Sequence, residues 1–196
     1  MLKNSLIIEG NDYNYAFFQR KSIKEVKNMI PDVVQAIKRA ARDGAIRVIV
    51  PGNFPIGILP IYLTAFQMNN SAAYDGHHCL KSFNNFAMDH NERLQQAIKE
   101  LKEEYHNATI VYGNYYDAFQ WLYGYAHYLE TTESLLRNRG DYDFSLGRMC
   151  GAPSVPVCDD PNRHISWDGV HLTHEANRVM ATWLIRDIFP KLKCYN

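Results

Sequence analysis

The stretch AIRVIVPGN, residues 45–53, decides the fold of this chain. Its apolar, β-branched run stops at Pro-Gly, which predicts a buried strand closed by a turn. Two further short apolar runs, NSLIIEG (4–10) and ATIVYGNYY (108–116), predict strands of the same kind. Polar residues follow each run, so the sequence predicts loops at GNDYN, PGNFPIG and YYDAF.

Helical patterns lie between and after these strands. Apolar residues recur at helical spacing in three segments, 22–45, 82–105 and 173–189. Ser22 and Glu25 have the spacing of a capping box, Pro31 is expected to kink or split the first helix, and Thr173 is expected to cap the last one. Alternating strands and helices predict an α/β fold with a mostly parallel sheet. Without repeats or a low-complexity linker, we expect one domain over residues 1–196.

The bulk composition excludes several classes of protein. Lys plus Arg is 21 and Asp plus Glu is 21, so bulk charge favours neither nucleic acid nor an anionic membrane as a partner. No run approaches the roughly 18 apolar residues of a membrane span. The N-terminus does not resemble a signal peptide, so the chain is expected in the cytoplasm if it is made as written. The glycosylation sequons at Asn69 and Asn107 matter only on a secretory route.

The cysteines and histidines do not have metal-site spacing. There is no CxxC, HxH or HExxH, so neither a metal nor a cofactor is expected. Cys150 and Cys158 bracket a short loop with two prolines, where a disulfide is easy to form in an oxidising compartment. The alternative is a pair of free thiols.

Two short motifs can carry chemistry. Gly10 and Asn11 follow the first predicted strand, where a backbone N–H and an amide N–H can donate to an oxyanion. The alternative is ordinary turn chemistry. In WDGVH, Asp168 can hold one nitrogen of His171 and leave the other to act as a base. The alternative is a loop aspartate that caps backbone amides beside a half-buried histidine.

The order of the motifs resembles a known family. GNDYNYAFF, RVIVPGNFPIGILPIYL and CDDPNRHISWDGVHLTHEANRVMA closely resemble the plant GDSL esterase/lipase family, within the SGNH hydrolases, over nearly the whole chain. The resemblance implies a three-layer α/β/α fold with a flavodoxin-like sheet. It also implies that Asn11 is an oxyanion donor, Asp168 the orienting acid and His171 the base. Members are usually secreted and act on small-molecule esters. The resemblance therefore implies that the substrate is an ester of a plant metabolite or lipid.

The chain departs from the family pattern in three respects. The Gly-Asp-Ser-Leu block with the nucleophilic serine and the second block with an oxyanion-hole glycine are absent, so the chain resembles the C-terminal portion of the family, missing its first strands. None of its eight serines lies in a G-x-S-x-G elbow. Ile58 stands where a cysteine is common, so Cys79 is expected to lack its family partner. The strand near Leu6–Glu9 would then be an exposed edge, available to a second copy or another partner.

The expected function is therefore that of a carboxylic ester hydrolase relative that is weak or inactive as an acyl-serine hydrolase. Three explanations remain open: a fragment or splice form of a full esterase, a non-hydrolytic descendant that uses His171 as a general base on a specialised metabolite, or a catalytically dead binding protein.

Overall fold

The computed structural model describes residues 11–128, 144–145, 147, 152–153, 155 and 160–192. Its α-helices are α1 (Asn11–Phe18), α2 (Ile23–Lys27), α3 (Ile30–Arg42), α4 (Pro60–Ala65), α5 (Lys81–Glu104), α6 (Tyr115–Tyr128) and α7 (His174–Ile188). Its strands are β1 (Arg47–Pro51) and β2 (Thr109–Gly113). Short 3₁₀ turns are η1 (Ile56–Ile58), η2 (Ser71–Ala73), η4 (Pro161–Arg163) and η5 (Phe189–Leu192). The predicted strand over 4–10 lies outside the described residues.

The described chain falls into two compact units. The first has its residues within Met1–Phe54, Asn85–Tyr116 and Leu184–Asn196, and the second within Pro55–Asn84 and Asp117–Trp183. One domain over 1–196 stays a prediction.

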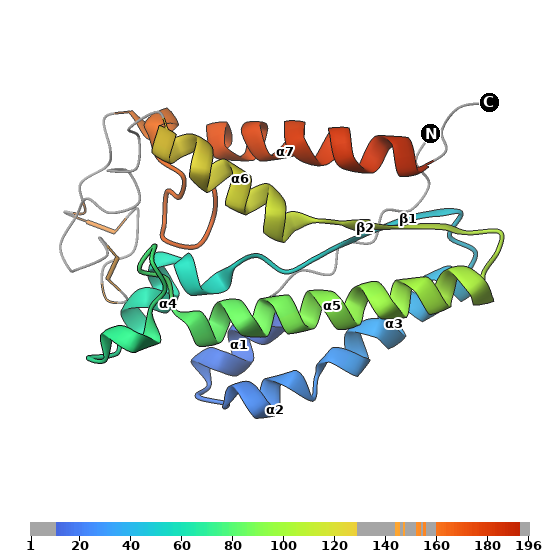
Figure 1. Ribbon diagram of the computed structural model, residues 1–196, viewed down its shortest axis with the longest axis horizontal. Coiled ribbons are helices and arrows are strands. Elements are labelled where there is room, and N and C mark those ends of the chain that lie inside the picture. The colour runs from blue at the N-terminus through green and yellow to red at the C-terminus, as the bar shows by residue number, and fades with distance from the viewer. Residues whose placement is uncertain are drawn as a thin grey trace. The chain divides into compact units, whose positions relative to one another are not determined.

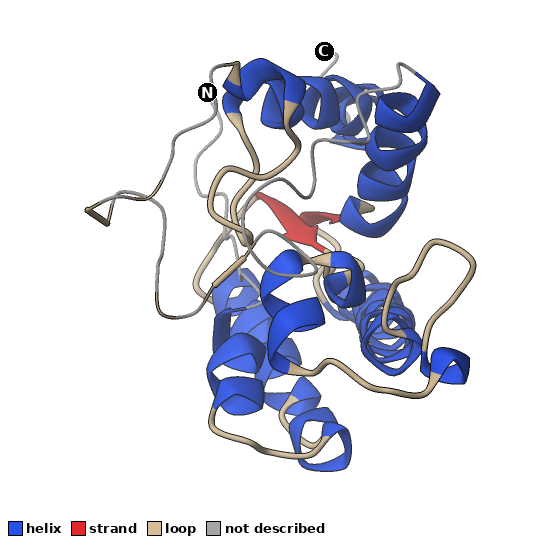
Figure 2. Cartoon of the chain, turned by 90° about the vertical axis from the view of Figure 1, so that its left-hand side faces the viewer, coloured by secondary structure: helices blue, strands red, loops and turns tan. Residues whose placement is uncertain are grey.

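The sheet of the first unit confirms two of the predicted strands. β1 and β2 pair in parallel, with Arg47 opposite Thr109 and Pro51 opposite Gly113 (Figure 1). Figure 2 shows this pair against a described chain that is otherwise helix and loop. Gly52 N–H donates to the Gly113 carbonyl at 2.8 Å, so the pairing continues one residue beyond β1.

The core of the first unit forms where helices pack on this sheet. Its buried apolar residues come from α3, β1, α5 and β2 and include Ile37, Val48, Val50, Leu94 and Ile110. Parallel strands joined by helices bury their apolar residues in this way, which confirms the α/β class.

The N-terminal helical segment splits as its proline predicts. The Ser22 hydroxyl accepts from Glu25 N–H at 3.3 Å, and Ser22 N–H donates to the Glu25 carboxylate at 2.7 Å, which completes the capping box of α2. The hydrogen bond from the Ser22 hydroxyl lowers the pKa of Glu25. Pro31 lies in the first turn of α3, where a missing N–H costs no helical hydrogen bond.

Two segments predicted as loops are helical instead. The described part of the first segment, NDYN (11–14), belongs to α1, because Tyr13, Ala16 and Phe17 fall on one face and are buried. YYDAF opens α6, where Ala118 and Phe119 are buried. In both cases the polar residues that suggested a loop lie at the start of a helix, where short polar side chains are also favoured.

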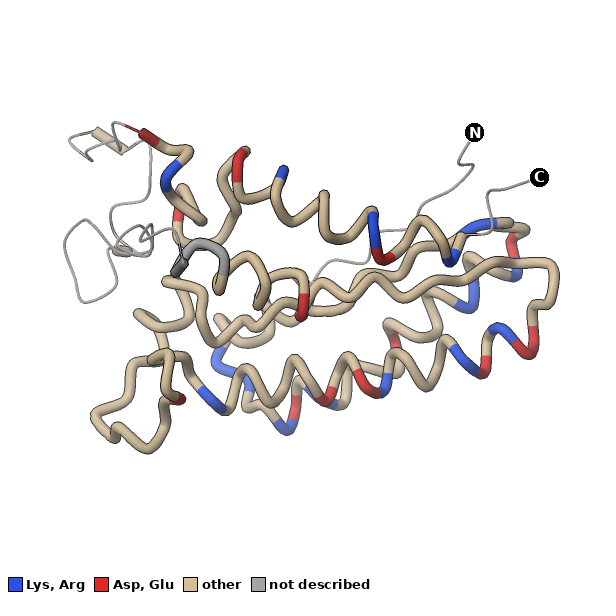
Figure 3. The backbone as a smooth tube through the Cα atoms, turned by 45° about the horizontal axis from the view of Figure 1, so that its top comes forward, with Lys and Arg blue, Asp and Glu red and all other residues tan. Residues whose placement is uncertain are grey.

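Charge is mixed along the surface helices. Acidic and basic residues are interspersed along α5 (Figure 3), and Lys38 pairs with Glu104 at 2.8 Å. None of the helices in the described part of the chain is both long and apolar enough to cross a bilayer.

Candidate active site

The Asp168–His171 segment is a tight turn closed by the residues on either side of it. Thr173 N–H donates to the Ile165 carbonyl at 2.8 Å, and Trp167 N–H donates to the His171 carbonyl at 3.1 Å. Ser166 and Leu172 form an isolated antiparallel bridge between these bonds. The turn is therefore held by main-chain contacts across its base.

Gly169 lets the chain reverse inside this turn. Its φ is +84°, a left-handed conformation that side chains disfavour, and a Cβ built there would overlap the ring of Phe144. Its carbonyl accepts from Ile61 N–H at 3.2 Å, which ties the turn to α4 within the second unit.

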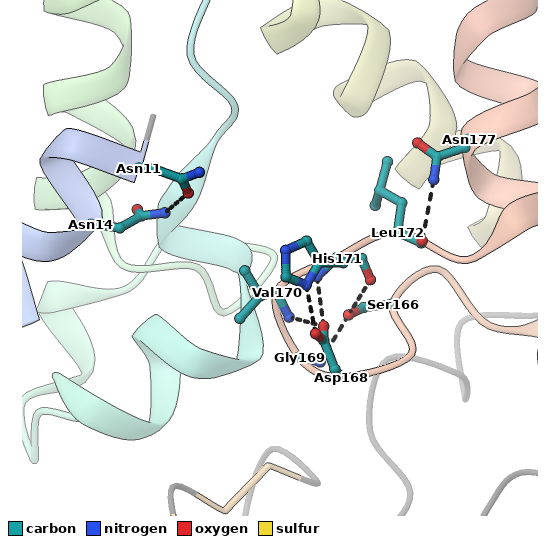
Figure 4. Close-up of polar contacts among 9 residues, drawn as sticks. All are labelled: Asn11, Asn14, Ser166, Asp168, Gly169, Val170, His171, Leu172 and Asn177. Atoms are coloured by element: carbon teal, nitrogen blue, oxygen red, sulfur yellow. Dashed lines mark hydrogen bonds and ion pairs between the residues drawn. The ribbon is translucent and has the colours of Figure 1, made fainter. Parts of the chain in front are cut away.

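The Asp168 carboxylate is occupied on both oxygens. Oδ1 accepts from Val170 N–H at 2.9 Å and His171 N–H at 2.6 Å, and Oδ2 contacts His171 Nδ1 at 2.5 Å (Figure 4). The side chain of Asp168 is only 8% exposed. The carboxylate therefore fixes both the backbone of the turn and the orientation of the imidazole.

The His171 imidazole is held at Nδ1, and most of the side chain is exposed. Because a carboxylate only accepts hydrogen bonds, the contact with Asp168 places a ring hydrogen on Nδ1, and in the neutral imidazole Nε2 then carries the lone pair. The side chain is 68% exposed. An imidazole in this state can accept a proton from a hydroxyl or a water that approaches Nε2.

Ser166, the serine nearest to this pair in the sequence, is engaged with the backbone. Its hydroxyl accepts from Gly169 N–H at 2.9 Å and donates to the His171 carbonyl at 2.9 Å (Figure 4). These bonds make Ser166 part of the framework of the turn. The sequence does not predict this role, because no residue pattern around Ser166 indicates that its hydroxyl bonds to the backbone of the turn.

The helix that follows anchors the turn, as its sequence predicts. The Thr173 hydroxyl accepts from Ala176 N–H at 3.2 Å and donates to the His164 carbonyl at 2.6 Å, so the predicted cap of α7 is confirmed. The Asn177 amide donates to the Leu172 carbonyl at 3.2 Å.

Of the two predicted oxyanion donors, Asn11 belongs to the first unit. Asn11 is the first residue of α1, and its Oδ1 accepts from the Asn14 amide at 3.5 Å (Figure 4). Gly10 lies outside the described residues. The roles of both residues stay predictions.

Other predicted features fall partly outside the described chain. Cys150, Cys158 and the strand near Leu6–Glu9 lie outside it, so the disulfide and the exposed edge stay predictions. Cys79 is a free, buried thiol, and burial, with help from Asp75, raises its pKa to about 12.

His90 is a core histidine of the first unit. His90 is buried on α5, where its Nδ1 lies 3.1 Å from the Tyr13 hydroxyl, and desolvation lowers its pKa to about 4. Within the described residues, no group of three or more His, Cys, Asp and Glu side chains is placed to hold a metal ion.

Comparison with known proteins identifies relatives over nearly the whole chain. The family model for GDSL-like lipase/acylhydrolase matches residues 5–184. An Arabidopsis thaliana GDSL esterase/lipase, At5g03980, is 46% identical over 98% of this chain and 63% of its own length. Acetylajmalan esterase 2 of Rauvolfia serpentina is 39% identical over 98% of this chain and 55% of its own length. Sinapine esterase of Brassica napus is 37% identical over 92% of this chain and 50% of its own length.

This chain thus spans about half to two-thirds of the length of these relatives. The relatives are esterases or esterase/lipases by name, and the family match agrees with the α/β fold. The chain belongs to the GDSL-like lipase/acylhydrolase family.

Proposed function

We propose that this chain carries the base of a carboxylic ester hydrolase site, with His171 as general base and Asp168 as its orienting acid. The observation that carries the proposal is the 2.5 Å contact between His171 Nδ1 and Asp168 Oδ2, with the imidazole exposed and the carboxylate nearly buried. A buried carboxylate on Nδ1 selects the tautomer that a base needs and stabilises the imidazolium that forms.

The proposed reaction uses the exposed nitrogen twice. Nε2 of His171 takes the proton of an attacking hydroxyl and later returns it to the leaving alcohol, while Asp168 keeps the ring in place. We assign Asn11 and Gly10 as donors to the negative oxygen of the tetrahedral intermediate. This chemistry requires neither a metal nor a cofactor.

These 196 residues have no assigned nucleophile, which limits the ester hydrolysis that they can catalyse alone. They contain no Gly-Asp-Ser-Leu block, and the Ser166 hydroxyl is bonded to the backbone. Removing one member of a catalytic triad lowers the rate by several powers of ten. We therefore propose little acyl-serine hydrolysis by these residues alone, with slow hydrolysis of reactive esters through water activated by His171.

The substrate that we propose is a small carboxylic ester of a plant metabolite or lipid. The support is the family, in which two relatives are named for the esters of plant metabolites, acetylajmalan esterase and sinapine esterase.

A fluorophosphonate probe with p-nitrophenyl butyrate hydrolysis tests this assignment on the 196-residue chain. We expect no stoichiometric labelling of any serine, and a slow hydrolysis that falls to the buffer rate in His171→Ala. The exposed histidine His106 gives the matched control, because His106→Ala should leave the slow rate unchanged. Labelling of one serine that disappears in His171→Ala would contradict the absence of a nucleophile. A slow hydrolysis rate that is unchanged in His171→Ala would contradict the role of His171 as general base.

A further inference from the structure

Trp167 lies directly beside the proposed base. Its indole stacks on the imidazole of His171, with ring centroids 6.0 Å apart and planes 22° from parallel. It is also 54% exposed, an unusual state for a side chain of this size. A single exposed apolar residue is ordinary on a protein surface, and what sets Trp167 apart is its contact with the reactive ring.

The turn fixes the backbone from which this indole projects. Trp167 N–H donates to the His171 carbonyl, so the two residues whose rings stack are also joined through their backbones. Ser166, the preceding residue, is bonded to both Gly169 and His171. Because the backbone is already ordered, only the side-chain torsions of Trp167 remain to be ordered when a ligand binds.

We infer that Trp167 is a specificity-determining residue that provides a stacking surface for a planar aromatic group of the ester, next to His171. The inference rests on the proposed function for the identity of the ligand as a substrate. Aromatic rings prefer offset-stacked or edge-to-face contacts with an indole, and a saturated ring of similar size lacks this preference. The acyl or alcohol part that binds here is therefore aromatic and flat.

Binding of two uncharged amides tests the inference without any chemistry. Benzamide is flat and aromatic, whereas cyclohexanecarboxamide has a similar size and the same amide but a puckered, saturated ring. The chain has three tryptophans, so 5-fluorotryptophan gives three ¹⁹F signals, and the one that is lost in Trp167→Phe belongs to Trp167.

We expect benzamide to shift the Trp167 signal and to bind about twofold to tenfold more tightly than cyclohexanecarboxamide. Trp167→Leu should remove the preference and Trp167→Phe should keep most of it, both measured by saturation transfer to the ligands. Trp121→Leu, at a tryptophan that is 43% exposed on α6, should leave the preference intact. Equal affinities for the two amides, or a preference that survives in Trp167→Leu, would overturn the inference.

The outcome separates the two proposals. A benzamide preference that depends on Trp167, in a chain whose ester hydrolysis ignores His171, contradicts the base and leaves the aromatic subsite standing. Hydrolysis that depends on His171 without any benzamide preference contradicts the subsite alone.

Discussion

Replacement of Gly169 by alanine should destabilise the chain through two separable effects. A side chain at its φ of +84° costs about 1–2 kcal/mol of unfolding free energy. The new Cβ would also overlap the ring of Phe144, which is buried, and overpacking of this kind costs about 1–3 kcal/mol. The expected loss is therefore about 2–5 kcal/mol.

Two other glycines isolate these effects. Gly44 has a φ of +90°, and the Cβ that an alanine would add there has nothing within 4 Å, so Gly44→Ala should cost only the conformational part. Gly76 has neither feature, and Gly76→Ala should be close to neutral.

Urea unfolding, followed by fluorescence and far-ultraviolet circular dichroism, measures the series. A double-mutant cycle with Phe144→Ala should recover about 1–3 kcal/mol, because the smaller side chain makes room for the Cβ. A Gly169→Ala loss no larger than that of Gly44→Ala, or a cycle without coupling, would refute the reasoning.

Three further predictions concern the first unit. Folding lowers the pKa of buried His90 from 6.5 to about 4, so the unfolded state binds more protons between these values. The free energy of unfolding should therefore fall by about 3 kcal/mol as the pH drops from 6.5 to 4. In urea titrations, the His90→Gln variant should show a flatter pH dependence of this free energy. The Asn91 side chain accepts from the Asn53 N–H at 2.6 Å and donates to the Asn53 carbonyl at 3.0 Å. Asn91→Ala should lower the free energy of unfolding in urea by about 2–4 kcal/mol. Asn85→Ala, at an exposed position, should lower it much less. Ser22→Ala removes the hydroxyl cap of α2 and should cost about 1 kcal/mol by the same measurement, whereas Ser22→Thr should cost little.

Local signals in the sequence predict much of this fold. The capping box at Ser22, the split at Pro31 and the cap at Thr173 all depend on neighbouring residues, and all are confirmed. The loops predicted at residues 11–14 and 115–119 are helix starts instead, because their polar residues suit a helix start as well as a loop. Only burial of the following aromatic residues decides between the two, and burial depends on tertiary packing.

In the candidate site too, some features could be predicted from the sequence and others could not. The three-residue spacing of Asp168 and His171 predicts a contact within one turn, and the structure has that contact. The overlap of Gly169 with Phe144 and the stack of Trp167 on His171 have no signal in the spacing. The first depends on a residue distant in sequence, and the second depends on how the turn orients two side chains.

The central claim, that His171 is the base of an ester hydrolase site, is tested most directly by supplying the missing nucleophile. The 196 residues would be joined to the part of the Arabidopsis GDSL esterase/lipase that the match leaves uncovered, and kcat/KM for p-nitrophenyl butyrate would be measured for the joined protein, its His106→Ala variant and its His171→Ala variant. We predict that the joined protein is active, that His106→Ala retains this activity, and that His171→Ala lowers it by about 10⁴-fold or more. A joined protein that hydrolyses the ester equally well with His171→Ala would contradict the claim.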